Sequence, residues 1–339
     1  MDRTRKITCR PVLLFLAVVL AIPSCIDDKI VDCRVDVSFN YSYNMLSSNA
    51  FEQQADQVAL YVFDEDGLLV AKHVSEENRL SDGFQMQTDD LKAGNYRFVA
   101  WAQSTDIKED KAYFNIPRLT VGTSFLDDLS YYLKRESGIQ QQELNNLLVG
   151  VTEVNINNVE GIHPVTIDLK KVTRRLRVVL LPYSGGTALD VEDYVFSIID
   201  DAGNGHINYD YGILPDEAIT YRPYYAANVL PDASETLPPE EIDRAAVVEL
   251  NTSRLIESHN PRLVISGKKN GKEIIRLNLP WFLSLTEMEG HKQAWSLQEY
   301  LDRQDEYVIT LFLDAEENLW MQNTIIINGW VINDLELGM

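Results

Sequence analysis

The most constraining feature of the sequence is a long stretch of two-residue alternation near its amino terminus. From Val31 to Tyr43, every odd-numbered residue is apolar or aromatic and every even-numbered residue is polar. Successive side chains of a β-strand point to opposite faces, so this pattern predicts one long strand with a buried face and a solvated face. Cys33 falls on the predicted buried face, where it would act as a small hydrophobic residue.

Short apolar segments bounded by turn residues recur along the rest of the chain. Strands are predicted at residues 57–63, 68–72, 96–102, 165–170, 172–181, 194–199, 247–250, 262–266, 273–279 and 307–313. The first two flank Asp64-Glu65-Asp66-Gly67, whose composition is typical of a hairpin turn. A calcium loop is the alternative, but Gly is missing at the sixth position that an EF-hand requires.

Two segments are predicted to be helical. Ser124–Arg135 places Leu126, Leu129 and Leu133 on one helical face, and Ser296–Glu299 matches a capping box that would open a short helix. Many short strands with few helices predict an all-β chain built as two β-sandwiches.

The domain boundary is placed near residue 170, which gives an amino-terminal domain at 31–170 and a carboxy-terminal domain at 171–339. Residues 211–241 are rich in Pro and acidic residues and are interpreted as a long loop. The basic stretch Lys170–Arg177 stands out in an acidic chain. It is either a solvated strand face that balances nearby acids or, less favoured, a patch for a partner.

The first 24 residues have the features of a secretory signal peptide. Basic residues between Arg3 and Arg10 precede an uncharged apolar run, Val12–Ile22. This run is too short to cross a bilayer as a helix, which takes about 20 residues, but it suits a signal sequence.

The end of that segment, Ile22-Pro23-Ser24-Cys25, resembles a lipobox. It predicts cleavage between Ser24 and Cys25, a lipid on the Cys25 thiol and residues 25–30 as a tether, and more than one acyl chain gives stable membrane anchoring. The acids at Asp27 and Asp28 resemble surface-export signals of lipoproteins. The alternatives are an ordinary signal peptide followed by a free cysteine, and acids that merely solvate the tether.

Composition and motifs argue against several other functions. The formal net charge is −22, which would repel nucleic acid. The chain has 5 His and 3 Cys, and none of the common zinc, phosphate-loop or nucleophile motifs occurs. We therefore expect no metal, no catalytic residue and no cofactor other than the covalent lipid. A hydrolase assembled by folding from the scattered histidines stays open as a third hypothesis; these are His73, His163, His206, His259 and His291.

An ordered set of segments resembles a known family. The set comprises the lipobox, residues 91–101 (LKAGNYRFVAW), 146–150 (NLLVG), 168–172 (DLKKV), 298–307 (QEYLDRQDEY) and 327–330 (INGW). Together they resemble the FimB-type minor fimbrial subunits, the fimbrillin-associated anchor lipoproteins of type V fimbriae in Bacteroidales-type bacteria.

The resemblance implies two tandem transthyretin-like β-sandwich domains, no catalysis, a place in a fimbrium at the outer membrane of the cell surface, and fimbrial shaft subunits as partners. Such subunits polymerise by β-strand exchange, and an anchor keeps its lipidated amino-terminal strand. The function expected is attachment of the fimbrium to the outer membrane and control of its assembly or length.

A partner-facing strand and a ligand site are also predicted. The apolar stretch Thr324–Ile332 is the candidate for strand exchange, through Ile325, Ile327, Trp330 and Ile332, with an internal sandwich strand as the alternative. A glycan- or host-binding surface adhesin is the alternative function. It would use exposed aromatics in a shallow cleft, with Trp281, Trp295 or Trp320 as candidates, although core packing is their ordinary role.

Overall fold

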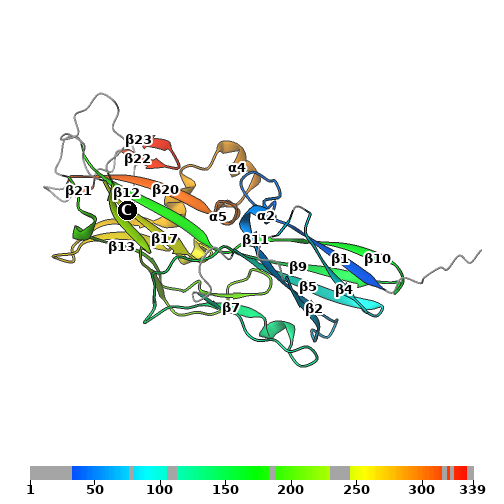
Figure 1. Cartoon of the computed structure of the whole chain (residues 1–339). Helices are drawn as coiled ribbons and strands as arrows, with labels where there is room; N and C mark the ends of the chain where they lie inside the picture. The colour runs from blue at the N-terminus through cyan, green and yellow to red at the C-terminus, as the bar shows by residue number, and fades with distance from the viewer. Residues whose placement is uncertain are drawn as a thin grey trace, which may run out of the picture.

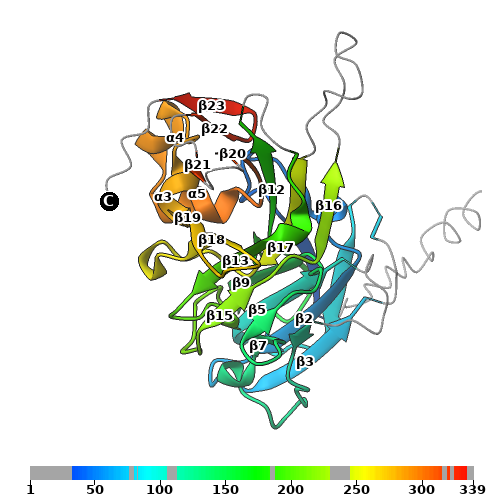
Figure 2. The same ribbon diagram turned by 90° about the vertical axis from the view of Figure 1, so that its left-hand side faces the viewer.

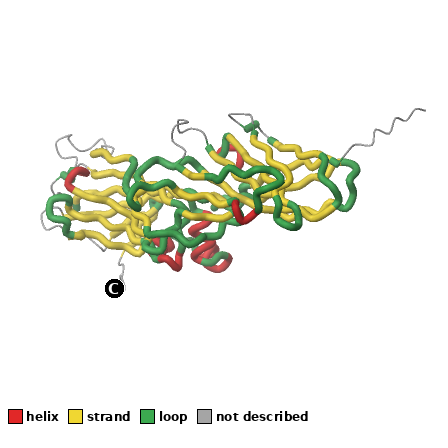
Figure 3. Tube along the Cα trace, turned by 90° about the horizontal axis from the view of Figure 1, so that it is seen from below, coloured by secondary structure: helices red, strands yellow, loops and turns green. Residues whose placement is uncertain are grey.

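The computed structural model describes residues 33–75, 80–81, 83–104, 113–183, 188–229, 245–314, 319–320 and 324–333. Within these ranges strands dominate and the helices are few and short, which confirms the all-β prediction. The strands form two modules arranged along the long axis of the molecule (Figures 1 and 3). Each module packs β-sheets around apolar side chains, as sandwiches do.

The first module is a sandwich of two sheets. Its elements are β1 (Arg34–Asn40), α2 (Phe51–Gln54), β2 (Gln57–Phe63), β3 (Leu69–Val74), β4 (Gln85–Asp89), β5 (Gly94–Gln103), β9 (Leu147–Ile156), β10 (Ile162–Asp168) and β11 (Lys170–Lys171). One sheet has the order β10-β1-β4 and the other β11-β9-β5-β2-β3. Buried side chains from both sheets, including Val37, Leu60 and Phe98, fill the space between them. The hairpin predicted at Asp64–Gly67 joins β2 to β3 and is confirmed.

Strand β1 is the strand predicted from the alternating pattern. Cys33, Val35, Val37, Phe39 and Tyr41 are buried, and the residues between them are half-buried. β1 lies in the middle of its sheet, parallel to β10 and antiparallel to β4. The two-residue period is confirmed, although the paired strand ends at Asn40, before the pattern does.

The second module is built around two sheets, which have seven and five strands in the described part of the chain. Its strands are β12 (Arg174–Pro182), β13 (Tyr194–Asp200), β15 (Ile219–Tyr221), β16 (Tyr225–Val229), β17 (Ala245–Thr252), β18 (Arg262–Gly267), β19 (Glu273–Asn278), β20 (Glu306–Asp314), β21 (Leu319–Trp320), β22 (Thr324–Ile327) and β23 (Trp330–Asn333). One sheet has the order β16-β17-β12-β20-β22-β23, with β21 on β20. The predicted loop at 211–241 contains β15 and β16, and residues 230–244 lie outside the described part of the chain.

The segment between β5 and β9 joins the two modules. It contains β6 (Phe114–Asn115), the short 3-10 helix η2 (Leu126–Asp128), β7 (Ser130–Leu133) and β8 (Ile139–Gln140). β7 pairs with β14 (His206–Asn208), and β8 extends the order β19-β18-β13-β15 as its last strand. The boundary near residue 170 stays a prediction, but strands from before it pair with strands from after it.

The helix predicted at Ser124–Arg135 is wrong. Only η2 is helical, and the chain then continues as β7, in which Tyr131 and Leu133 are fully buried while Ser130 and Tyr132 are half-buried. The spacing of Leu129 and Leu133 fits both the period of a helix and the two-residue period of a strand, so the sequence alone could not distinguish the two structures. The pairing of this segment with β6 and β14 stabilises the strand conformation.

The carboxy-terminal part combines three short helices with a hairpin. The helices are α3 (Leu279–Ser284), α4 (Glu289–Ala294) and α5 (Leu297–Arg303). The Ser296 hydroxyl accepts a hydrogen bond from the Glu299 N–H at 3.1 Å, which confirms the predicted start of α5. The apolar stretch at 324–332 is two strands, because Asn328 and Gly329 both adopt positive φ (49° and 82°) and form a tight turn between β22 and β23.

Candidate functional site

The predicted lipid site lies outside the described residues. Ser24, Cys25, the signal peptide at 1–24 and the tether at 25–30 all precede Cys33, the first residue that the structure describes. Across the described ranges, no helix has the length and apolarity needed to cross a membrane. The structure therefore bears on the strand that the tether would enter, not on the lipid itself.

Strand β1 is held along both of its edges. Arg34 to Asn40 pair with Ile162 to Asp168 on one side, and Arg34 to Ser38 pair with β4 on the other. Side chains add to the ladder, since the Asn40 amide donates to the Asp168 carboxylate at 2.6 Å. The first module is thus closed by its own amino-terminal strand.

The predicted strand-exchange region forms the edge of the largest sheet (Figure 2). In the described residues, β22 pairs with β20 through Ile327 with Ile309 and Ile326 with Thr310. β23 pairs with β22, placing Ile332 opposite Ile325 and Trp330 opposite Ile327, and is the last strand in the order. The Ile327 side chain is fully buried; the side chains of Ile325, Trp330 and Ile332 lie outside the description. β22 is therefore an internal strand, and β23 is the edge among the strands that the structure describes.

A buried polar network lies where the modules meet. Arg174, which is fully buried, donates to the carbonyls of Leu301 and Lys171 and to the Tyr211 hydroxyl. Asp302 of α5 accepts two hydrogen bonds from Arg254, at 2.8 and 2.6 Å. Burial alone would lower the pKa of Arg174, but Tyr211 and Asp302 raise it, so the guanidinium keeps its charge.

Lys171 links the first module to the second. Its ammonium group donates to Gln54 of α2 at 2.9 Å and to Asp305, just after α5, at 2.5 Å. Burial lowers the pKa of Lys171, and the Asp305 carboxylate opposes that shift. The basic stretch Lys170–Arg177 is therefore partly a solvated face, as favoured, and partly a buried contact that sequence reasoning missed.

Beside this network, alternating cations and rings form what we call the cation–aromatic column, which consists of His291, Trp295, Arg303, Tyr43 and Lys170. His291 stacks on Trp295 with ring centroids 4.2 Å apart, and Arg303 lies over both Trp295 (4.6 Å) and Tyr43 (4.3 Å). Lys170 covers Tyr43 at 4.9 Å. Because Tyr43 follows β1 closely, the column ties the end of the amino-terminal strand to α4 and α5.

The other candidate residues do not converge. His73 bonds to Thr88, His206 to Ser130 and His259 to Asp200, His163 lies on β10 and His291 lies in the column. Within the described ranges, no group of His, Cys, Asp or Glu is arranged to hold a metal ion. In the acidic turn, Asp64 accepts hydrogen bonds from the backbone N–H groups of Asp66 and Leu68, which is the role of a turn residue.

The three candidate tryptophans lie in three different environments. Trp281 on α3 is 40% exposed. Trp295 stacks with His291 and is covered by Arg303 in the column, so its ring is already engaged by two side chains of this chain. Trp320 packs against the core of the second module. The structure does not bring these residues together in one cleft.

Tandem strand-built modules with a seated amino-terminal strand define the class of this protein as a chain of β-sandwich modules. A family model described as "Fimbrillin-A associated anchor proteins Mfa1 and Mfa2" matches residues 30–336. The chain therefore belongs to this family of fimbrial anchor proteins, which is a structural family and not a family of enzymes. The resemblance inferred from the sequence is confirmed.

Individual relatives agree with this assignment. The chain is 22% identical to the minor fimbrium anchoring subunit Mfa2 of Porphyromonas gingivalis, over 99% of both chains. The crystal structure of the Porphyromonas gingivalis fimbrial anchor protein Mfa2 matches with a TM-score of 0.66 at 18% identity, covering 90% of this chain and 100% of that one. A candidate polysaccharide-binding protein of Bacteroides thetaiotaomicron matches at 36% identity and a TM-score of 0.73, covering 90% and 99% of the two chains.

Proposed function

We propose that this protein is a lipid-anchored minor subunit that attaches a fimbrium to the outer membrane through Cys25. The observation that carries the proposal is the position of β1. Cys33 lies eight residues after Cys25, so a fully extended tether reaches at most about 30 Å. The strand that follows the tether is the central strand of its sheet, and the lipid would therefore be joined to the core of the first module.

The anchoring step is tested by metabolic labelling with a palmitate analogue. The wild-type chain is expected to carry the label and to sediment with membranes, whereas a Cys25→Ala variant is expected to be unlabelled and released. Cys9→Ala is the matched control, because Cys9 lies in the predicted signal peptide. An unlabelled wild-type chain, or a Cys25→Ala variant that stays with the membrane, would show that the proposal is wrong.

We further propose that the fimbrial shaft contacts the opposite, carboxy-terminal part of the chain by strand exchange. β23 supports this because it is the edge strand of its sheet, and an edge strand presents backbone groups that a partner strand can pair with. β1 cannot pair with a partner strand in this way unless it leaves its position in the first module. A subunit whose own β1 closes its first module would accept no strand from another subunit there. It would therefore end a polymer at the membrane and thereby limit its length.

A truncation after Gly329 separates this role from a structural one. It removes β23 and keeps β22, whose Ile327 belongs to the core. The expected result is a folded protein that no longer co-purifies with the shaft subunit. Retained co-purification, or an unfolded truncation product, would contradict an exchange role for β23.

A second candidate function is a surface adhesin that binds glycans on the same fold. It is favoured by the relative at 36% identity that is described as a candidate polysaccharide-binding protein. The two functions are compatible, since an anchor at the cell surface could also hold a glycan.

A further inference from the structure

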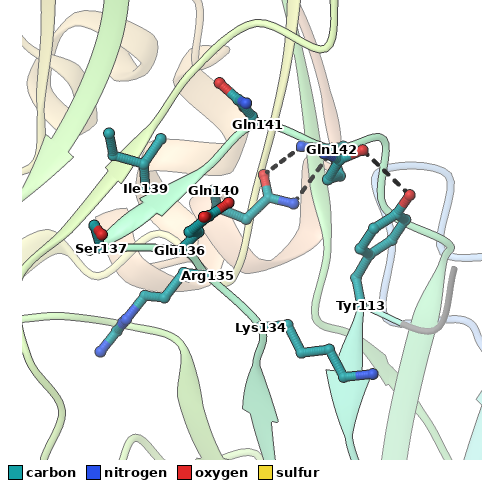
Figure 4. A pocket seen from close by; sticks show the side chains of 9 residues that line it. All are labelled: Tyr113, Lys134, Arg135, Glu136, Ser137, Ile139, Gln140, Gln141 and Gln142. Atoms are coloured by element: carbon teal, nitrogen blue, oxygen red, sulfur yellow. Dashed lines mark hydrogen bonds between the residues drawn. The ribbon is translucent and has the colours of Figure 1, made fainter.

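An open cleft that none of the predicted site residues line lies beside β6, β7 and β8 (Figure 4). Its volume is about 540 Å³, within the range of roughly 300–1,000 Å³ that is usual for ligand sites. The lining residues are Tyr113, Lys134, Arg135, Glu136, Ser137, Ile139, Gln140, Gln141 and Gln142. Eight of these nine side chains carry a polar group, and five of the eight are uncharged.

One wall of the cleft is fixed by the second module. Arg135 makes a two-pronged ion pair with Asp216, at 2.9 and 2.6 Å, and Asp216 also accepts from the Gly205 N–H at 2.8 Å. Ser137 and Gly138 both adopt positive φ (51° and 77°) and turn the chain tightly into β8. Backbone and side chains are therefore held in place before a ligand arrives, which lowers the entropy cost of binding.

The opposite wall presents amide groups. Gln140 is buried, and its side-chain amide donates to the Gln142 carbonyl at 3.1 Å and accepts from the Gln142 N–H at 3.3 Å. The Tyr113 hydroxyl donates to the Gln142 side-chain oxygen at 3.3 Å, which orients that amide (Figure 4). Gln141 and Gln142 are exposed. A carboxamide both donates and accepts hydrogen bonds, as the hydroxyl groups of a sugar do.

The charge balance of the cleft selects among ligand classes. The Arg135 charge is neutralised by Asp216, and the lining contains one further cation, Lys134, and one acid, Glu136, so an anion would find no excess of positive charge. Apart from Ile139 and the ring of Tyr113, the apolar surface of the lining belongs to residues that also carry a polar side-chain group, so an apolar ligand would bury polar groups without hydrogen-bond partners. A peptide strand would find only the two residues of β8 to pair with, too few for strand addition.

We propose that this cleft binds a neutral oligosaccharide, with the Gln141 and Gln142 amides bonding to sugar hydroxyls and the Tyr113 ring against a sugar face. The proposal rests on the second candidate function, the glycan-binding adhesin, and is independent of lipid anchoring. It also places the ligand away from the three tryptophans considered above, none of which lines this cleft.

The test uses the full chain on an array of neutral and sialylated oligosaccharides, followed by calorimetry with the neutral oligosaccharide that gives the strongest signal. A Gln141→Ala/Gln142→Ala double variant is expected to bind roughly tenfold more weakly or worse, because two hydrogen-bonding groups are lost. The matched control is Gln85→Ala/Gln87→Ala, which removes two exposed glutamines from β4. Circular dichroism and the melting temperature check that both variants are folded.

Each outcome bears on a different claim. Binding of a neutral glycan that is lost only in the Gln141/Gln142 variant, and that does not change with salt, supports the proposal. Binding that survives this variant overturns the cleft assignment and leaves the adhesin function standing. No binding by the wild-type chain overturns both, and binding of sialylated glycans alone overturns the neutral class. Anchoring is judged separately by the palmitate experiment.

Discussion

Replacing Tyr43 should loosen the link between the amino-terminal strand and the second module. Its ring contacts two cations, Arg303 at 4.3 Å and Lys170 at 4.9 Å from the ring centroid. Tyr43→Ala removes both cation–aromatic contacts, each worth about 1 kcal/mol in a half-buried setting, for a total of about 2 kcal/mol. A change of that size makes opening of this contact about 30-fold more frequent.

Hydrogen exchange read out by mass spectrometry measures this opening directly. Peptides that cover 34–43 and α5 are expected to exchange about 30-fold faster in Tyr43→Ala, while peptides from β18 and β19, which contribute no residue to the column, stay unchanged. Guanidinium unfolding should show the same loss of about 2 kcal/mol if the modules unfold together.

The control is Tyr43→Phe, which keeps the ring. The Tyr43 hydroxyl makes no hydrogen bond to any residue that the structure describes, so this variant should stay within about 0.5 kcal/mol of wild type. If Tyr43→Ala and Tyr43→Phe exchanged at the same rate, the ring would not couple the modules and the reasoning would be refuted.

Three further predictions concern buried groups. Asp302→Ala should cost about 3–5 kcal/mol in chemical denaturation, because it leaves the cations Arg174 and Arg254 without their carboxylate partner. Exposed Arg177→Ala should change stability by less than about 0.5 kcal/mol, and equal effects would contradict the network. Burial alone would raise the pKa of Asp216, but hydrogen bonds from Arg135 and from backbone N–H groups lower it. The contribution of Asp216 to stability is therefore present at neutral pH and lost on acidification below about pH 4. Asp216→Asn should reduce this loss of stability when unfolding is measured as a function of pH. Burial and Asp89 raise the pKa of the Cys33 thiol, so Cys33 should resist maleimide until denaturant is added. Rapid labelling of Cys33 at neutral pH would show that β1 is not seated in its sheet.

The sequence was most informative where one period was unambiguous. In β1, no helical spacing competes with the alternation from Val31 to Tyr43, and the burial of Val35, Val37 and Phe39 follows it. At β7 two periods overlapped, so the local pattern was undecided and pairing with distant strands determined the structure.

The contacts at the junction of the modules could not be derived from local patterns. Lys171 and Arg174 meet α5 and Asp305 only because the chain returns to them more than 120 residues later. The one available signal was a basic stretch in an acidic chain, and a pattern of charges does not reveal which of them are buried. The cleft has the same origin, because its rigid wall depends on Asp216, which is 81 residues from Arg135.

The position of β1 also has a mechanical consequence. If the chain is held at Cys25 and a fibre pulls on the far module, the pull runs lengthwise through β1, from Arg34 towards Tyr43. Hydrogen bonds to β10 and β4 are then sheared together along both edges and cannot be unzipped one after another. At its far end, Tyr43 passes the tension on to Arg303 and Lys170. A strand in this geometry can bear drag from flowing fluid far better than one peeled from a sheet edge.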